Sequence, residues 1–350
     1  MTTGPLRRLS PTRLTDLLAC QLRVKHSLSG GSDGDAETRA GPQAFHAALG
    51  TVCHEVLERI CLDGDLANPE VFSRAWNDSL AEHSGGDADQ VLLTWPELAL
   101  TKVRLRRALA RIAALVDEAP GELKPELELD SADGRLRGRL DLAVRGPNPW
   151  IADLKTGRIR PTPEDPVSPT HIRQLQLYAY LEAEASGTWP TQAWLITLQG
   201  RDHVVDIDPA VSRAVVDTAL DALDDFNRDY PNISAAPGGD NCSWCVHLPL
   251  CPEPWSADTD WGDSHAALLA IIRVRHGSGA AWIDAEVLAG TLEASIVSLR
   301  RVDLDDHPAA RDLNAGERVV VVGLHRMDAP DTWELRRTSR LVRYVRAVSS

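Results

Sequence analysis

The sequence predicts an α/β protein in which a mixed central sheet is flanked by helices and followed by a small β-rich domain. Three patterns support this fold class. Apolar residues recur at helical spacing up to about residue 118, and they alternate with polar residues from 126 to 155. Helical and strand patterns then alternate up to about 226, and strand-like segments follow beyond 262.

The helices are expected from apolar spacing and from their start signals. The first runs from Leu9 to about Val24, because Ser10-Pro11-Thr12 resembles a cap with proline in the first turn. Residues 28–42 are rich in Gly, Ser and Asp and predict a loop. Further helices are expected at 44–62, within 72–118 with a break at Trp95-Pro96, at 171–185 and at 209–226.

The strands fall into two groups. A meander is expected at 126–129, 136–144 and 150–155, followed by strands at 193–198 and 203–207. Four later segments, at 281–288, 294–302, 317–324 and 333–345, predict a small barrel of four or five strands, with an OB-like fold as the leading interpretation. The expected organisation is one domain over 1–255, a linker over 256–262 and a β-rich domain over 263–350.

Composition limits the class of protein. With 350 residues, 43% hydrophobic and 25% charged, the chain is typical of globular proteins. It has neither an apolar run of 18 residues nor a signal-peptide pattern, so we expect a cytoplasmic protein without membrane partners. The net charge of -14 argues against coating nucleic acid over the whole surface but does not exclude a local cleft.

Basic residues are nevertheless clustered in two runs. Each run has two interpretations, a solvated face or a contact with phosphates. The runs are Lys102, Arg104, Arg106, Arg107 and Arg111, and Arg336, Arg337, Arg340, Arg343 and Arg346. In the second region, Trp282, Trp333 and Tyr344 either stack on single-stranded DNA or fill the core of the β-rich domain.

Two neighbouring strands carry acidic residues and a lysine. Asp153 and Lys155 are two apart in a strand and therefore share one face, and the preceding turn can bring Asp141 beside them. Carboxylates bind Mg²⁺ or Mn²⁺, and an ammonium can orient water or stabilise charge during phosphodiester hydrolysis. Lys155 is one of only four lysines in the chain. The simpler interpretation of Asp-x-Lys alone is a surface ion pair.

Two helical segments add polar residues at a spacing of four. His54 and Glu58 share one helical face, as do Gln174 and Tyr178. Taken singly, the histidine is more simply a satisfied core residue, and the Gln/Tyr pair a solvated or structural one.

The cysteines favour a metal site over a disulfide framework. Cys242-x2-Cys245 is followed after five residues by Cys251, and Cys20 is the fourth candidate ligand. Thiolates at this spacing can hold zinc or an iron-sulfur cluster, and the spacing alone does not separate the two. Cys53 and Cys61 lie on an expected helix and are interpreted as small buried apolar residues.

Together these motifs resemble the RecB-like branch of the PD-(D/E)XK nucleases. The resemblance covers about residues 9–255 and lies in Gly50 to His54, Gly138 to Asp141, Asp153-Leu154-Lys155-Thr156-Gly157 and Gln174 to Tyr178. It implies a restriction-endonuclease-like core, with Asp141, Asp153 and His54 at a Mg²⁺ or Mn²⁺ site and Lys155 as the catalytic lysine. Gln174 and Tyr178 would support the site. Glu126 or Glu128 offers a further carboxylate, although alternating glutamates on an edge strand normally face solvent.

The cysteine spacing resembles AddB-type and CRISPR-associated RecB-type exonucleases, whose four cysteines hold a 4Fe-4S cluster. Gln21 stands where these proteins have a proline after the first cysteine. The resemblance implies cleavage of single-stranded DNA or DNA ends in repair, phage defence or CRISPR adaptation, together with a helicase or integrase partner. Any motor must come from a partner, because the sequence lacks a Gly-x4-Gly-Lys-Ser/Thr motif. Two rivals are a catalytically inactive DNA-binding scaffold that retains the cluster and a zinc-stabilised nuclease.

Overall fold

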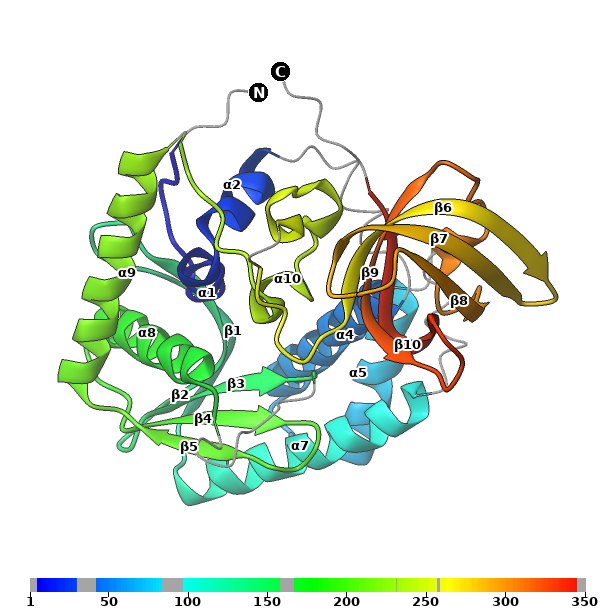
Figure 1. Cartoon of the computed structure of the whole chain (residues 1–350). Helices are drawn as coiled ribbons and strands as arrows, with labels where there is room; N and C mark the ends of the chain where they lie inside the picture. Colours follow the sequence, from blue (N-terminus) through cyan, green and yellow to red (C-terminus); the bar gives the residue numbers. More distant parts are fainter. Residues whose placement is uncertain are drawn as a thin grey trace. The chain divides into compact units, whose positions relative to one another are not determined.

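The structure is a computed structural model that describes residues 5–29, 42–83, 97–157, 167–230, 232–256 and 259–344 (Figure 1). The chain divides into two compact units. The sheet unit comprises the described residues of Gly4–Thr15 and Phe45–Tyr230. The barrel unit comprises those of Asp16–Ala44 and Pro231–Ser350. No helix in the described part of the chain is long and apolar enough to cross a membrane.

A mixed sheet of five strands forms the centre of the sheet unit, as the sequence predicted. The strand order is β1(Glu122–Asp130), β2(Arg137–Arg145), β3(Trp150–Lys155), β4(Gln192–Thr197) and β5(His203–Asp206). Neighbouring strands are antiparallel except β3 and β4, which are parallel because α8(Pro169–Ser186) crosses between them.

Helices cover the sheet on both faces. On one face, α4(Pro42–Asp63), α5(Pro69–Glu82) and α7(Leu98–Glu118) share a core with strand residues such as Leu142, Val144 and Leu154. On the other, α8 contacts β1 to β4 and is itself packed against α9(Pro209–Asp229) (Figure 1). Asp141 and Asp153 alternate with these core residues along β2 and β3. Burial of the apolar positions therefore fixes the direction in which the carboxylates point.

The expected helix from Leu9 to Val24 is two helices. α1(Pro11–Ala19) ends before Cys20, and α2(Gln21–Ser29) begins after it. The backbone N–H of Arg23 donates to the carbonyl oxygen of Cys20 at 3.1 Å, which starts the second helix. Apolar spacing continues on both sides of Cys20, so periodicity did not reveal this break. The expected break at Trp95-Pro96 and most of the expected loop at 28–42 lie outside the described residues.

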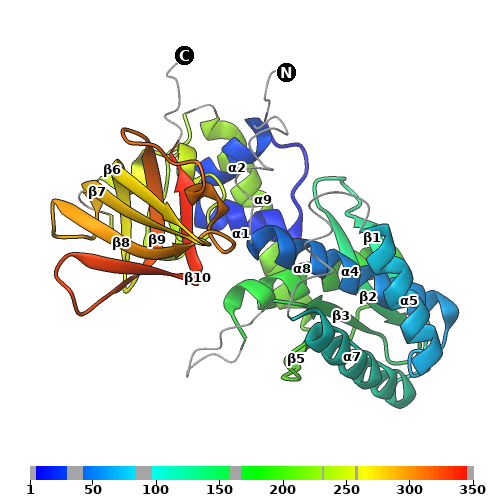
Figure 2. The same cartoon turned by 90° about the vertical axis from the view of Figure 1, so that its right-hand side faces the viewer.

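The barrel unit contains a closed five-stranded barrel with the order β10-β8-β7-β6-β9 (Figure 2). Its strands are β6(Ala266–Gly277), β7(Ala280–Gly290), β8(Ile296–Asp303), β9(Arg318–Arg326) and β10(Thr332–Arg343). The sequence named four of these but not β6. The first half of β6 is apolar on both faces, because one face fills the barrel and the other packs on Cys242, Leu248 and Trp261. Two buried faces hide the alternation that marks a strand.

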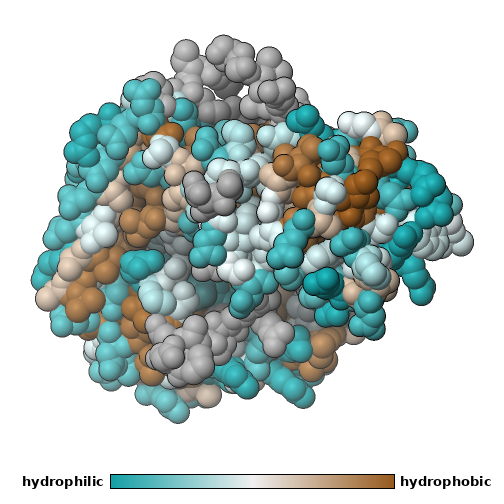
Figure 3. All heavy atoms as spheres, viewed as in Figure 1, coloured by the Kyte–Doolittle hydropathy of each residue, from teal (hydrophilic) through white to brown (hydrophobic). Residues whose placement is uncertain are grey.

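The surface of the barrel also carries apolar side chains. Figure 3 shows hydrophobic residues over β6 and β7, and the large exposed apolar residues in these strands are Ile272 and Leu288. Such single exposed residues are ordinary for a folded protein.

The cysteine segment packs on the barrel, where η1(Leu248–Leu250), a 3-10 turn, contacts β9. The segment begins at the short helix α10(Gly239–Cys242). A β-carbon at Gly239 would lie 2.2 Å from the carbonyl oxygen of Trp261, so only glycine fits there. The cysteine segment and the barrel are thus parts of one folded unit.

Candidate active site and cysteine site

A cavity of about 530 Å³ in the sheet unit is lined by all six site residues predicted from the nuclease-like motifs. The cavity is lined by residues of α4, the sheet and α8. His54 comes from α4, Asp141 from β2, Asp153 and Lys155 from β3, and Gln174 and Tyr178 from α8. Residues that are separated by more than 120 positions in the sequence therefore face one space.

The strand register places three carboxylates in one row. Pro125 pairs with Leu142 and Leu127 with Leu140, so Glu126 lies opposite Asp141. The β2–β3 ladder ends at the pair Leu142 and Ala152, and the next position in register sets Asp141 opposite Asp153. Like charges directly opposite in a sheet repel. The row therefore needs cations to hold it together.

Asp141 and Asp153 are both buried and are bound differently. Oδ2 of Asp141 accepts a hydrogen bond from the backbone N–H of Leu154 at 2.6 Å. Oδ1 of Asp153 accepts from Nε2 of Gln174 at 3.2 Å, and its Oδ2 lies 2.7 Å from Nζ of Lys155. Burial, followed by the neighbouring charge of Asp153, raises the pKa of Asp141. The two carboxylates are thus held close together at an electrostatic cost.

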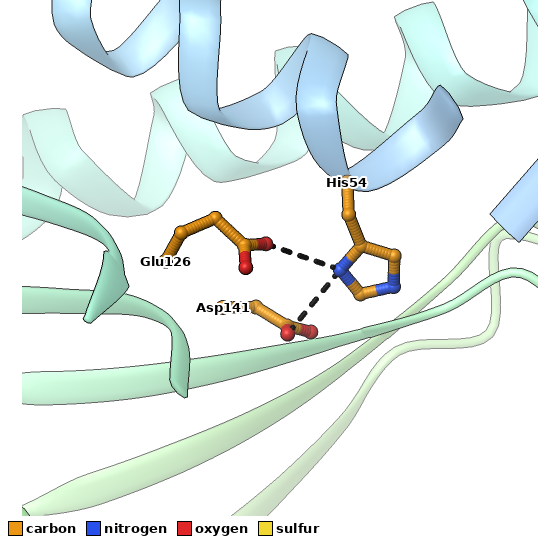
Figure 4. A group of neighbouring side chains, drawn as sticks. All are labelled: His54, Glu126 and Asp141. Carbon is orange, nitrogen blue, oxygen red and sulfur yellow. Dashed lines mark ion pairs between the residues drawn. The ribbon is translucent and has the colours of Figure 1, made fainter. Parts of the chain in front are cut away.

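His54 supplies one of the cations of the site. Its Nδ1 lies 3.2 Å from Oδ1 of Asp141 and 3.4 Å from Oε1 of Glu126 (Figure 4). Burial alone lowers the pKa of this histidine, but the hydrogen bonds and charges of Asp141 and Glu126 outweigh it and raise the pKa to about 10. In the absence of metal, His54 is therefore an imidazolium at neutral pH.

Glu126 is the carboxylate that the sequence could not distinguish from Glu128. The side chain of Glu126 is 6% exposed and lies in the cavity, whereas that of Glu128 is 57% exposed and paired with Arg137. Glu126 has φ 46°, a left-handed conformation that costs a residue with a β-carbon about 1–3 kcal/mol. Such strain at a buried charged residue points to a functional role.

Lys155, Gln174 and Tyr178 also line the cavity. Nζ of Lys155 donates to Oε1 of Gln174 at 3.0 Å, so the amide of Gln174 connects Lys155 with Asp153. The ring of Tyr178 packs against β2, and a β-carbon at Gly138 would lie 2.7 Å from its Cε1. This close approach explains the glycine that precedes Asp141. Burial and the charges of Asp153 and Asp141 raise the pKa of Tyr178, so its phenol stays protonated.

The donor set fits a divalent metal. Ligand atoms of His54, Glu126 and Asp141 all lie within 4.8 Å of one another (Figure 4). Oε1 of Glu126 and Oδ2 of Asp153 are buried and lack a hydrogen bond, although each lies within ion-pair distance of His54 or Lys155. Carboxylate oxygens with one imidazole match the preferences of Mg²⁺ and especially Mn²⁺.

A second cavity, of about 20 Å³, lies in the barrel unit and is lined by the four predicted cysteine ligands. Cys20 comes from the junction of α1 and α2, Cys242 from the end of α10, and Cys245 and Cys251 from the turns that follow. All four are free thiols. Backbone N–H groups of Ala236 and Gly238 donate to sulfur of Cys20 and Cys242 at 3.5 Å each.

The other two cysteines behave as predicted for buried apolar residues. Cys53 and Cys61 lie in the core of the sheet unit, and burial raises the pKa of each thiol to about 12. Burial also raises the pKa of Cys251 to about 11, so this thiol needs a bound metal to be a thiolate at neutral pH.

The two basic runs differ in how many of their residues form ion pairs. Arg111 is paired with Asp202, and Lys102 lies over the ring of Trp76. In β10, ion pairs engage Arg336 with Glu334, Arg337 with Asp306 and Arg343 with Glu317, whereas Arg340 is buried and Arg346 lies outside the described residues. These pairs favour the structural interpretation of the second run.

The aromatic residues of the barrel differ in their surroundings. Trp333 is buried in the barrel core, so the stacking role considered for it is wrong. Tyr344 packs on the apolar cluster beside Cys242. Trp282 is half-buried and lies over Gly277 at the β6–β7 turn.

Comparisons with known proteins give one family. The profile of the PD-(D/E)XK nuclease superfamily matches residues 8–252. No curated protein matches the chain. Among solved structures, one titled "Crystal structure of SSO0001" aligns with 71% of this chain and 88% of its own, at 14% identity and a TM-score of 0.31.

Replacing Glu126 with glutamine should weaken Mn²⁺ binding by at least about tenfold, because the site loses one of its charged ligands. Glu128→Gln is the matched control, since it removes the same charge from the same strand outside the cavity. Isothermal titration calorimetry with Mn²⁺ measures both variants. Equal affinities for the two would contradict a ligand role for Glu126.

Metal binding through His54 should release a proton at about pH 7.5. The raised pKa keeps the imidazole protonated below about 10, and a metal binds only the neutral ring. Mn²⁺ affinity should accordingly increase as pH rises towards that value. Calorimetry in two buffers with different ionisation enthalpies counts the protons, and His54→Asn should release about one fewer. The same release from both proteins would exclude His54 as a ligand.

Proposed function

This chain belongs to the PD-(D/E)XK nuclease superfamily, and on this basis we propose that it is a Mg²⁺- or Mn²⁺-dependent deoxyribonuclease acting on single-stranded DNA or DNA ends. The observation that carries the proposal is the row of Glu126, Asp141 and Asp153 with Lys155 beside it in one cavity. An inactive scaffold has no need for this set of buried, mutually repelling carboxylates.

In this proposal Asp141, Asp153, Glu126 and His54 hold the metal. When bound, the metal would polarise the scissile phosphate and lower the pKa of an attacking water. Lys155 donates a hydrogen bond to Gln174, forms an ion pair with Asp153 and lines the cavity. From there the ammonium can orient the water or stabilise the negative charge that develops on the phosphate. Gln174 is a positioning residue for both side chains.

Asp153→Ala and Lys155→Ala should each lower the nuclease rate at least about 100-fold, because each removes charge stabilisation at the reacting phosphate. Asp130→Ala and Lys124→Ala are matched controls from the same sheet, both outside the cavity. The measurement is degradation of end-labelled single- and double-stranded DNA with Mn²⁺ or Mg²⁺, after thermal unfolding has shown equal stability. Absence of wild-type activity on any DNA, or unchanged rates in both active-site variants, would reject the proposal.

We further propose that Cys20, Cys242, Cys245 and Cys251 hold a 4Fe-4S cluster. A single zinc ion with bonds of about 2.3 Å needs sulfur atoms about 3.8 Å apart. Among the described residues, no three cysteine sulfurs come within 4.8 Å of one another, whereas the four thiols do surround one cavity. This wider spacing supports a larger cluster. Its main role would be structural, since it closes a loop of more than 200 residues between Cys20 and Cys242.

Anaerobically purified protein should contain about four iron and four sulfide per chain, as expected for this cluster type. Cys20→Ala and Cys245→Ala should lose iron, while Cys61→Ala should retain it because Cys61 lies in the core of the sheet unit. Iron, zinc and sulfide analysis decides between the metals. A colourless protein that contains zinc would reject the cluster.

The remaining proposals concern the barrel and the partners. We propose a nuclease domain over 1–255, a linker over 256–262 and an OB-like barrel over 263–350. The closed order of five strands, with β10 parallel to β8, supports the OB-like fold. Trp282 is the aromatic residue still available to stack on DNA. We also propose that the protein acts in the cytoplasm with a helicase or integrase partner, in repair, defence or CRISPR adaptation.

A further inference from the structure

Arg340 in β10 is buried against the cysteine segment of the same unit. The residue is 7% exposed. Its Nη1 donates to the carbonyl oxygens of Ser243 and Cys245 at 2.9 and 3.0 Å, within the Cys-x2-Cys turn. Its Nη2 is buried without a hydrogen-bond partner. A charged group from the barrel therefore lies against the backbone of the turn that carries Cys242 and Cys245.

The charge of Arg340 lacks an anionic partner in the described part of the chain. Guanidinium groups stay protonated in proteins, and burying one without a negative charge is unfavourable. No carboxylate in the described ranges lies within 4.0 Å of its nitrogens. Two backbone carbonyls offset only part of that cost. The arrangement is favourable if the cysteine site itself carries the negative charge.

Arg23 brings a second guanidinium to the same site. It lines the cysteine cavity together with Cys20, Cys242 and Cys245. Its Nη1 donates to Oδ1 of Asp16 at 2.9 Å, and its Nη2 to the carbonyl oxygen of Asn241. Its Nε is buried without a partner. Two arginines from different elements, α2 and β10, thus lie at the cysteine site.

We propose that Arg23 and Arg340 are the counter-charges of an anionic metal-thiolate cluster and raise its reduction potential. This inference rests on the cluster proposed above. Reduction adds one negative charge to the cluster, so a nearby guanidinium stabilises the reduced form more than the oxidised form. Arg340 lies outside the region matched by the family profile, whereas the four cysteines lie inside it, so a residue of the barrel would set a property of the cluster.

The test is a redox titration of the intact chain followed by electron paramagnetic resonance. In Arg340→Gln and Arg23→Gln the reduced cluster should be disfavoured about tenfold, which corresponds to a potential about 59 mV lower for a one-electron couple. Arg340→Lys, which keeps the charge, should restore most of the wild-type potential. Arg326→Gln is the matched control, because it removes an exposed charge from the neighbouring strand β9. All potentials are compared at equal iron content.

The outcomes separate the two proposals. Equal potentials in wild type and both glutamine variants, with the cluster intact, would overturn the counter-charge role and leave the cluster standing. If the wild-type protein contains zinc, the cluster proposal fails. The arginines are then judged by the rate of zinc release to a chelator, which should increase in both glutamine variants but not in Arg326→Gln. Equal release rates would overturn the inference in that case too.

Discussion

The row of Glu126, Asp141 and Asp153 across three adjacent strands is the constraint on which the sheet unit depends. Three carboxylates at this spacing repel one another, and burial increases the repulsion by reducing solvent screening. Opposite charges compensate from two sides. His54 on α4 binds the first two carboxylates, and Lys155 binds the third. The cavity is thus an arrangement of ion pairs that a divalent cation can replace in part.

The apolar core holds this unfavourable row in place. Leu142 and Leu154 belong to the core cluster under α4, α5 and α7, and a shift of one residue in either strand would move them out of it. The register that buries these leucines is the register that aligns the carboxylates. Where the β2–β3 ladder ends, the carboxylate of Asp141 accepts the N–H of Leu154. A residue proposed to bind the metal therefore also satisfies a backbone N–H of the sheet.

The barrel unit combines the proposed cysteine ligands with apolar packing in a similar way. Cys242, Leu248 and Trp261 cover the outer face of β6 and β9, at Leu268, Val320 and Val322. The cysteine segment is too short to form a core alone, so the barrel wall supplies its apolar support. The same barrel delivers Arg340 to the Cys-x2-Cys turn. Ligand geometry, packing and charge at the cysteine site consequently depend on one another.

Local pattern was sufficient for much of the fold. Alternation predicted β1 to β5, apolar spacing predicted α4, α8 and α9, and spacing within one strand placed Asp153 and Lys155 on the same face. The break at Cys20 and the strand β6 were missed. At Cys20, apolar residues continue at helical spacing across the end of one helix and the start of the next. In β6, burial of both faces removes the alternation that marks a strand.

The sequence by itself determined which residue types form the two sites, because motif spacing and strand alternation are local properties. Tertiary structure decided which glutamate belongs to the carboxylate site. Glu126 and Glu128 have the same parity in β1 and look equivalent in sequence, but of the two only Glu126 lies opposite Asp141, with its side chain buried in the cavity. Tertiary structure also decided the surroundings of the arginines in β10. Arg340 is buried and bonds to the cysteine turn, whereas Arg336 and Arg343 form ion pairs with glutamates. Register and burial depend on contacts between distant segments, which no local pattern records.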